Sequence, residues 1–322
     1  MISDKKVCVV GAGRWGKNHI RTLDELGALG GFVEMNREVL TELSGKYPDV
    51  KIYTKLDDAL INDDFDGFTV ATPAETHYNI AKKIIIAKKH VLVEKPLTLQ
   101  IDQAEELVTL AENNNVNLMV GHLLLFHPAI VKIKELINNG KIGHLQYIYS
   151  NRLNLGQVRT QENVFWSLAP HDISIFQYFT DSFPKEIKAQ GSSFLQKGIH
   201  DSTITYLKYP NGEEGHIFVS WLHPFKEHRL VVIGSEAMIT FEDSTEGKPL
   251  KIYSKKFDMR SGVPEKIDGP MKRIEYEQKM PLSEELKYFV EHLDGAVLQI
   301  ANSQHALEVT KILVEASNQL EN

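Results

Sequence analysis

Along the first third of the chain, short apolar runs alternate with stretches in which apolar residues recur every three or four positions. The first run, Val7–Val10, is followed by Ile20, Leu23 and Leu26 at helical spacing. The alternation continues with strand-like runs at Gly31–Met35, Val50–Tyr53, Gly67–Ala71, His90–Val93 and Asn117–Val120, and helix-like stretches at Arg37–Tyr47, Thr76–Ala87 and Ile101–Asn114. Strands and helices that alternate at this length predict parallel βαβ units and a doubly wound sheet.

After about Gly121 the pattern changes. A helix is predicted at Pro128–Asn138, and the turn Pro210-Asn211-Gly212 favours hairpins of an antiparallel sheet. The longer alternating runs predict strands at Leu145–Asn154, Ile187–Phe194, Thr203–Tyr209, Gly215–Leu222, Arg229–Gly234 and Met238–Glu242. Helices are expected at Ser283–His292 and Ser303–Leu320, and a surface loop at Val263–Met280, which is rich in charges, proline and glycine.

These patterns predict an α/β protein of two domains. Residues 1–121 form a dinucleotide-binding domain, and residues 122–322 form an α+β domain with an antiparallel sheet. The two C-terminal helices, at residues 283–292 and 303–320, can pack against the first domain instead of the second.

A glycine-rich segment joins the first predicted strand to the first predicted helix. It contains Gly11, Gly13 and Gly16 in the order G-x-G-x-x-G. This pattern in this context is typical of a turn that lets backbone approach a pyrophosphate at a helix N-terminus. We therefore assign the whole segment to cofactor binding: Gly11, Ala12, Gly13, Arg14, Trp15 and Gly16.

An acidic residue stands where the ribose of a dinucleotide is usually bound. Glu34 ends the second predicted strand, close to the ~20 residues beyond the glycines at which such an acid binds the ribose hydroxyls. Its charge would repel a 2′-phosphate, which favours NAD over NADP, although Arg37 nearby leaves a phosphate possible. Asn36 is assigned to the same site.

Two further loops follow the carboxyl ends of predicted strands, where ligands bind in open α/β sheets. One contains Ala71, Thr72 and Pro73, with His77 just beyond, and the other contains Glu94-Lys95-Pro96. Proline disfavours helix at the residue before it, so Lys95 is expected to project from a strand end. We assign both loops to cofactor binding: Ala71, Thr72, Pro73, His77, Glu94 and Lys95.

Composition narrows the classes of protein that remain. The 322 residues carry a net charge of −7, which argues against binding nucleic acid mainly through phosphates. No apolar run reaches the ~20 residues that span a bilayer. The only cysteine, Cys8, excludes a disulfide framework and a cysteine-based zinc site, so we expect a soluble protein of the reducing cytoplasm.

Several motifs together resemble one family. Besides the glycine segment, Ala71-Thr72-Pro73 and Glu94-Lys95-Pro96, they are Val120-Gly121-His122, Phe126-His127-Pro128 and Pro170-His171-Asp172-Ile173. In this order and spacing they resemble the glucose–fructose oxidoreductase/inositol dehydrogenase (Gfo/Idh/MocA) family across essentially the whole chain. The resemblance implies a Rossmann domain, a second domain whose large, mostly antiparallel open sheet often makes subunit contacts, and oxidation of sugar or inositol hydroxyls with NAD or NADP.

The resemblance also implies catalytic roles for Lys95 and His171. A histidine suits reversible proton transfer near neutral pH, and a lysine can stabilise a developing oxyanion. Many family members have an aspartate four residues before the histidine, where this chain has Ser167. A serine supplies no carboxylate, so no such role is transferred, and Asp172 is only a candidate substitute.

Within the family, segments 121–128, 162–172 and 220–226 resemble the UDP-N-acetylglucosamine 3-dehydrogenase type. This implies oxidation of a nucleotide-linked N-acetylamino sugar at its 3-hydroxyl to a 3-keto sugar, for surface polysaccharide or lipid A synthesis. The expected substrate-binding residues are Lys95, His122, Arg152, Arg159, Asn163, Trp166, His171 and Asp172.

Other functions remain open at this point. One alternative is an inositol or free-sugar dehydrogenase, and another is a non-catalytic redox sensor that binds dinucleotide. No metal site is expected, because His122 and His127 lack a third ligand at suitable spacing. A homodimer or homotetramer is expected from the resemblance alone.

Overall fold

The computed structural model describes residues 4–62, 64–160 and 162–320. The chain divides into two compact units. The first comprises residues 1–126 and 279–310, and the second comprises residues 127–278 and 311–322. Residues 279–310 thus count with the first unit, although they follow most of the second in the sequence.

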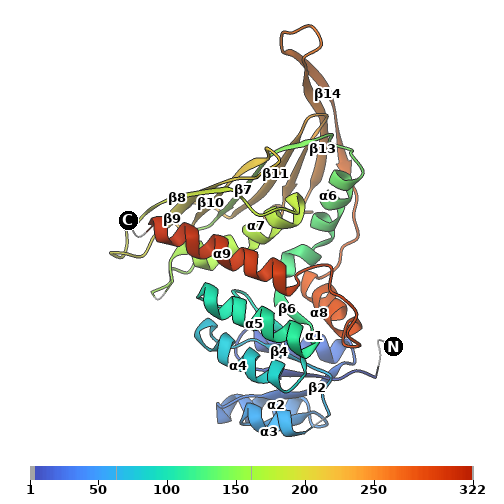
Figure 1. The fold of residues 1–322 in the computed structure, drawn as a ribbon, viewed down its shortest axis with the longest axis vertical. Helices are drawn as coiled ribbons and strands as arrows, with labels where there is room; N and C mark the ends of the chain where they lie inside the picture. The colour runs from blue at the N-terminus through green and yellow to red at the C-terminus, as the bar shows by residue number, and fades with distance from the viewer. Residues whose placement is uncertain (1–3, 63, 161, 321–322) are drawn as a thin grey trace. The chain divides into compact units, whose positions relative to one another are not determined.

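A six-stranded parallel sheet forms the centre of the first unit (Figure 1). The strand order is β3-β2-β1-β4-β5-β6. The strands are β1 (Val7–Val10), β2 (Leu29–Val33), β3 (Lys51–Tyr53), β4 (Gly67–Val70), β5 (His90–Glu94) and β6 (Leu118–Gly121). The order reverses between β1 and β4, which creates the crevice where dinucleotides bind in this kind of sheet. The predicted doubly wound α/β domain is confirmed.

Helices connect these strands and bury their apolar sides. They are α1 (Gly16–Glu25), α2 (Arg37–Lys46), α3 (Leu56–Ile61), α4 (Ala74–Ile86), α5 (Ile101–Asn114) and the short η1 (Leu123–Phe126), with α8 (Pro281–Glu291) from the C-terminal part. Strands β1 and β4 are buried along their whole length, as parallel strands covered on both faces must be. Helix α8 packs on α1 and η1, so a late segment of the chain contributes to this unit.

An eight-stranded sheet forms the second unit, with the order β14-β13-β12-β11-β7-β10-β9-β8. Its strands are β7 (Leu145–Leu153), β8 (Glu186–Ser192), β9 (Ser202–Lys208), β10 (Glu214–Ser220), β11 (Glu227–Gly234), β12 (Met238–Glu242), β13 (Leu250–Asp258) and β14 (Glu265–Ile274). All neighbours are antiparallel except β7 and β10, which confirms the predicted mostly antiparallel sheet.

Helices cover one face of this sheet (Figure 1). They are α6 (Pro128–Asn138) and α7 (Val164–Thr180), together with the end of α9 (Ser303–Leu320). Helix α7 packs on β7, β9 and β10, and Gln319 at the end of α9 hydrogen-bonds to the backbone of β8. Helix α7 was not predicted from the sequence, because it is apolar nearly all round and therefore lacks a clear 3.6-residue stripe.

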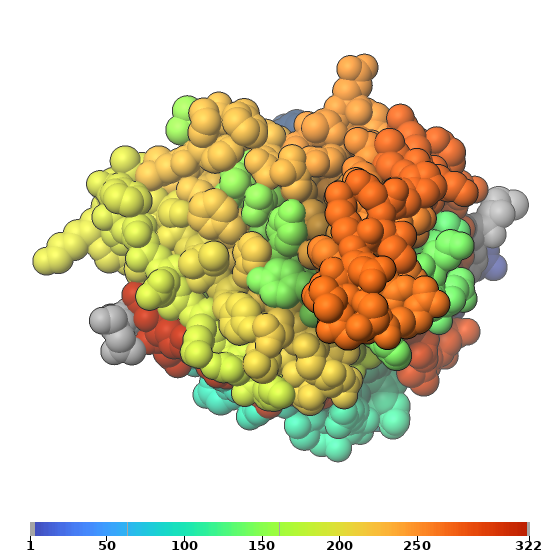
Figure 2. Space-filling view, turned by 90° about the horizontal axis from the view of Figure 1, so that it is seen from above, coloured from blue at the N-terminus to red at the C-terminus, as the bar shows by residue number. Residues whose placement is uncertain are grey.

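The hairpin of β13 and β14 corrects one prediction. Residues 263–280 were expected to form a surface loop, but Glu265–Ile274 is a strand paired with β13. Nearly every residue of β14 is exposed, so it shows no alternation of buried and exposed positions. Figure 2 shows this hairpin, in orange, standing out at one side of the unit. Within the described ranges, no helix is long and apolar enough to cross a membrane.

Candidate active site

The glycine segment makes a tight turn between β1 and α1. Gly11 has φ +88°, and a Cβ on Gly16 would lie 1.9 Å from the carbonyl oxygen of Gly11. A Cβ on Gly13 would meet nothing within 4 Å. Gly11 and Gly16 are therefore needed for the turn itself, while the space beside Gly13 is open for a ligand to approach the backbone.

Glu34 is held against this turn by backbone hydrogen bonds. One carboxylate oxygen accepts from the Ala12 amide at 2.8 Å, and the other accepts from the Met35 and Asn36 amides at 2.8 Å. The side chain of Asn36 caps α2 by accepting from Glu38. The sequence thus places an ionisable acid beside the glycine turn, as ribose binding requires.

His77 joins the two predicted strand-end loops. Its Nε2 lies 2.9 Å from the carbonyl oxygen of Thr72, and its Nδ1 lies 2.8 Å from that of Pro96. Pro73 is the N-cap residue of α4, and the Lys95–Pro96 peptide bond is cis. His77 is buried, so it acts here as a link between the loops after β4 and β5.

Glu94 connects the glycine segment to Lys95. Its carboxylate accepts hydrogen bonds from Trp15 Nε1 and from the Lys95 amide at 3.2 Å, and it lies 2.8 Å from His19 Nε2. A Cβ on Gly121 would lie 3.0 Å from this carboxyl group, so glycine at that position leaves room for it. The backbone of Lys95 is therefore fixed at the carboxyl end of β5.

His122 is fully buried at the end of β6. Neither ring nitrogen has a hydrogen-bond partner among the described residues, and the ring packs edge-on against His305 at 5.5 Å. Burial lowers the pKa of His122 well below its usual range, and the neighbouring His305 and Lys95 lower it further. A neutral imidazole with unused donor and acceptor atoms is suited to bind a ligand that enters beside it.

The arrangement in the first unit fits a dinucleotide. It combines a turn that only glycine allows, open space at Gly13, an acid at the ribose position and polar groups after β4, β5 and β6. Arg14 and Trp15 are exposed on the same segment. Within the described ranges, no group of three or more His, Cys, Asp or Glu side chains is placed to hold a metal ion.

Helix α7 carries the candidate residues of the second unit. Asn163 caps it by accepting from the Trp166 amide at 3.1 Å, and His171 and Asp172 follow in its second and third turns. Asp172 is buried and accepts two hydrogen bonds from Arg152 on β7, at 2.7 Å from Nε and 3.1 Å from Nη2. Arg152 thus joins α7 to the sheet.

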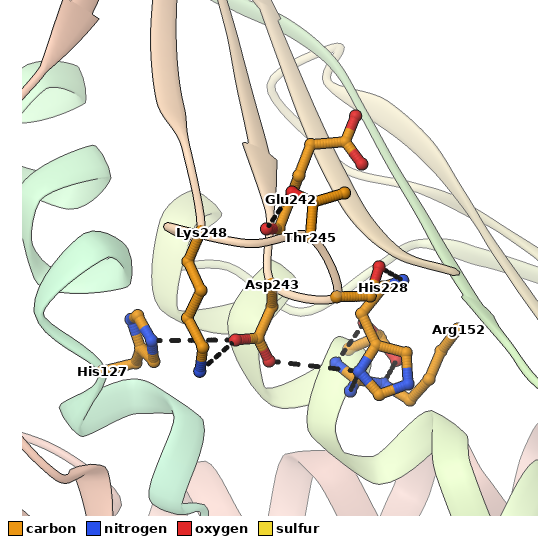
Figure 3. A network of polar contacts seen from close by, with 9 residues as sticks. His127, Arg152, His228, Glu242, Asp243, Thr245 and Lys248 are labelled. Atoms are coloured by element: carbon orange, nitrogen blue, oxygen red, sulfur yellow. Dashed lines mark hydrogen bonds and ion pairs between the residues drawn. The ribbon is translucent and has the colours of Figure 1, made fainter. Parts of the chain in front are cut away.

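Arg152 also belongs to a larger polar network, together with His228, Asp243 and Lys248 (Figure 3). Arg152 Nη1 lies 3.4 Å from His228 Nδ1, which is 4.0 Å from Asp243. Asp243 also pairs with Lys248 at 2.7 Å. Burial alone would raise the pKa of Asp243, but His228 and Lys248 hold it well below its usual range. The aspartate therefore stays ionised.

The structure groups the predicted site residues by unit. The predicted residues around the glycine turn and at the ends of β4, β5 and β6 lie together. Helix α7 carries Trp166, His171 and Asp172, and Asn163 caps it. Arg159 lies on an exposed segment just before α7, 3.6 Å from Glu162.

Three buried or partly buried polar residues, His228, Asp243 and Glu285, were not predicted from the sequence. Glu285 is fully buried in α8. A signal for it was present, because it shares a helix face with Leu282 and Phe289, where an acid is unusual. No motif marked His228 or Asp243.

Two family models match the chain. "Oxidoreductase family, NAD-binding Rossmann fold" matches residues 5–122, and "GFO/IDH/MocA C-terminal domain" matches residues 130–240.

Relatives of known sequence are described as oxidoreductases. An uncharacterised oxidoreductase, YrbE of Bacillus subtilis, is 28% identical over 63% of this chain and 63% of its own, so the match spans less than two thirds of that relative. A UDP-N-acetylglucosamine 3-dehydrogenase of Acidithiobacillus ferrooxidans is 25% identical over 80% of this chain and 79% of its own. A myo-inositol 2-dehydrogenase of Thermotoga maritima is also 25% identical, over 75% and 76%.

Solved structures share the fold. The A. ferrooxidans 3-dehydrogenase GnnA superposes with a TM-score of 0.87 at 20% identity, covering 98% of this chain and 97% of that one. GenD2 from gentamicin A biosynthesis, solved in complex with NAD, has a TM-score of 0.81 at 22% identity, covering 99% and 95%.

Proposed function

Because the chain belongs to the Gfo/Idh/MocA family of oxidoreductases, with an NAD-binding Rossmann domain, we propose that it oxidises a nucleotide-linked N-acetylamino sugar. The substrate resembles UDP-N-acetylglucosamine, and the 3-hydroxyl becomes a ketone. The A. ferrooxidans relative supports this choice, since it matches over most of both chains. The product would serve surface polysaccharide or lipid A synthesis, and the enzyme would act as a homodimer or homotetramer.

The observation that carries the proposal is the fixed position of Lys95. Its amide is bound by Glu94 at the carboxyl end of β5, on the side of the sheet that receives the nicotinamide half of a dinucleotide. Lys95 stabilises the negative charge that develops on the reacting oxygen. NAD, when bound, accepts the hydride.

His171 takes the hydroxyl proton in this proposal. Its helix is held to the sheet by the buried Arg152–Asp172 pair, which fixes the position of the residue next to His171. A histidine is a suitable base because its pKa ordinarily lies near ~6.5. Asn163, Trp166 and Arg159 bind the rest of the substrate.

A second candidate is oxidation of inositol or a free sugar. The T. maritima myo-inositol 2-dehydrogenase supports it with the same identity over a similar share of the chain. A non-catalytic redox sensor is disfavoured, because the family model that matches residues 5–122 describes an oxidoreductase.

The proposal is tested by incubating the protein and NAD with UDP-N-acetylglucosamine, its 6-carboxylate analogue, myo-inositol and free hexoses. Mass spectrometry would detect the loss of two hydrogens from the sugar, and absorbance would detect NADH. We expect turnover of one nucleotide sugar. Turnover of inositol or a hexose alone would overturn the substrate assignment.

The catalytic roles are tested with Lys95→Ala and His171→Ala. Each is expected to lower kcat by about 10²–10⁴-fold, the usual contribution of a positioned acid or base. Lys55→Ala and His144→Ala, at exposed positions, are matched controls. Activity that survives the double substitution of Lys95 and His171 would refute the mechanism.

A further inference from the structure

Helix α8, which packs on α1, carries a buried acid that the proposed reaction does not use. Glu285 on α8 is fully buried, and neither of its carboxyl oxygens has a hydrogen-bond partner among the described residues. In such a place the ionised form of a carboxyl group is strongly disfavoured relative to the neutral acid. Burial raises the pKa of Glu285 well above its usual range, and the charge of Glu94 raises it further.

Glu94, the neighbour of Glu285, has a different environment. Its carboxylate accepts hydrogen bonds from Trp15 and from the Lys95 amide, and it contacts His19 Nε2 at 2.8 Å. The two buried carboxyl groups therefore differ: Glu94 has three polar partners, while Glu285 has none among the described residues.

Few charged groups surround this pair. Helix α1, which packs on α8, presents the buried His19, and β5 presents Glu94, with Lys95 following it. Helix α8 also packs on η1, which has the sequence Leu-Leu-Leu-Phe and no titratable side chain, and Phe289 of α8 lies against Gly67 of β4. His122, just before η1, is neutral. A charge that appears on Glu285 would thus be poorly screened by water.

The pair also lies at the redox-active end of the cofactor site. In a sheet of this order, the ribose acid at β2 marks the adenosine half, and β4 and β5 receive the nicotinamide half. Glu94 ends β5. The oxidised nicotinamide ring carries one positive charge that the reduced ring lacks, so a negative charge nearby favours the oxidised form.

We propose that Glu285 holds a proton beside the hydrogen-bonded Glu94 in the unliganded protein, and that this pair makes the preference for oxidised over reduced cofactor depend on pH. Binding of NAD then releases part of the Glu285 proton to solvent, while binding of NADH leaves it in place. Loss of the proton as the pH rises strengthens binding of NAD relative to NADH. Glu285 acts through Glu94 and is a positioning residue.

The test compares the dissociation constants of NAD and NADH for the wild type and for Glu285→Gln, from about pH 6 to about pH 9, the range in which buried glutamates titrate. Glutamine keeps the shape of the protonated acid but cannot lose the proton. We expect the ratio of the dissociation constant of NADH to that of NAD to rise over this pH range in both proteins. The rise should be about tenfold larger in the wild type than in Glu285→Gln, which corresponds to one pKa unit of coupling.

The comparison controls for other titrating groups, because Lys95, His19 and His122 are present in both proteins. Equal pH dependence in the two proteins would overturn the proposal, as would complete loss of NAD binding by Glu285→Gln at pH 6. If the variant does not fold, titration calorimetry of the wild type in buffers of different ionisation enthalpy measures the number of protons released when NAD or NADH binds. Equal proton release on binding NAD and NADH would contradict the proposal. None of these measurements requires the sugar substrate.

Discussion

The ion pair between Arg152 and Asp172 offers a direct test of how the second unit is held together. Arg152→Met would remove both hydrogen bonds to Asp172, at 2.7 and 3.1 Å, and leave the carboxylate buried without its partner. Arg152 is 9% exposed and Asp172 is 3% exposed, so water cannot replace the lost partner. We expect a large loss of stability.

The size of the loss follows from the burial of both charges. Removing one partner of a buried pair costs about 3–5 kcal/mol, whereas replacing both partners with apolar residues is often nearly neutral. For a domain of this size, such a loss lowers the melting temperature by roughly 10 °C. The double variant Arg152→Met with Asp172→Leu should recover most of the stability that Arg152→Met alone loses.

Thermal unfolding followed by circular dichroism and calorimetry would measure these changes. Arg229→Met is the matched control, because Arg229 pairs with Glu242 at 2.7 Å in the same sheet but its side chain is 41% exposed. Arg229→Met should lower the free energy of unfolding by no more than about 1 kcal/mol. Equal small losses for both arginines, together with a raised KM in Arg152→Met, would refute a structural role and favour the predicted role in substrate binding.

Three further predictions concern the first unit. Gly16→Ala should destabilise this unit by about 3 kcal/mol, because the new Cβ would lie 1.9 Å from the carbonyl oxygen of Gly11. Gly13→Ala should keep the stability and weaken NAD binding, and melting curves together with titration calorimetry distinguish the two variants. Stability should fall as the pH drops through about 6.5, because His122 takes up a proton in the unfolded chain but not when it is buried in the folded one. The variant His122→Gln should therefore show a smaller fall in melting temperature between about pH 7 and about pH 5. Glu34→Ala should weaken NAD binding about tenfold or more and reduce the discrimination against NADP, measured with both cofactors; unchanged discrimination would contradict the assigned role.

Local sequence signals were sufficient for most of the first unit. Its strands are short apolar runs, and its glycine turn lies at a fixed place between a strand and a helix, so a single motif locates several site residues. His77 and Glu94 were assigned to the site from their strand-end positions. Their hydrogen bonds to Pro96 and Trp15 were not foreseeable, because those partners are distant in the sequence.

In the second unit, the contacts between site residues depend more on residues that are distant in the sequence. Arg152 was expected to bind substrate, and only the packing of α7 on β7 shows that two of its donors are used by Asp172. His228 and Asp243 meet because β11 and β12 are neighbours in the sheet. Pairing between distant strands creates this network, and no sequence motif marks it.

Strand β14 has a further consequence for the behaviour of the protein at high concentration. As the last strand of the sheet, it presents an edge on which another chain could add a strand and begin aggregation. Its sequence, EKIDGPMKRI, counters this, because Pro270 offers no amide donor and the strand carries five charged side chains. The charges and proline that made this segment resemble a loop thus act as gatekeepers against misassembly.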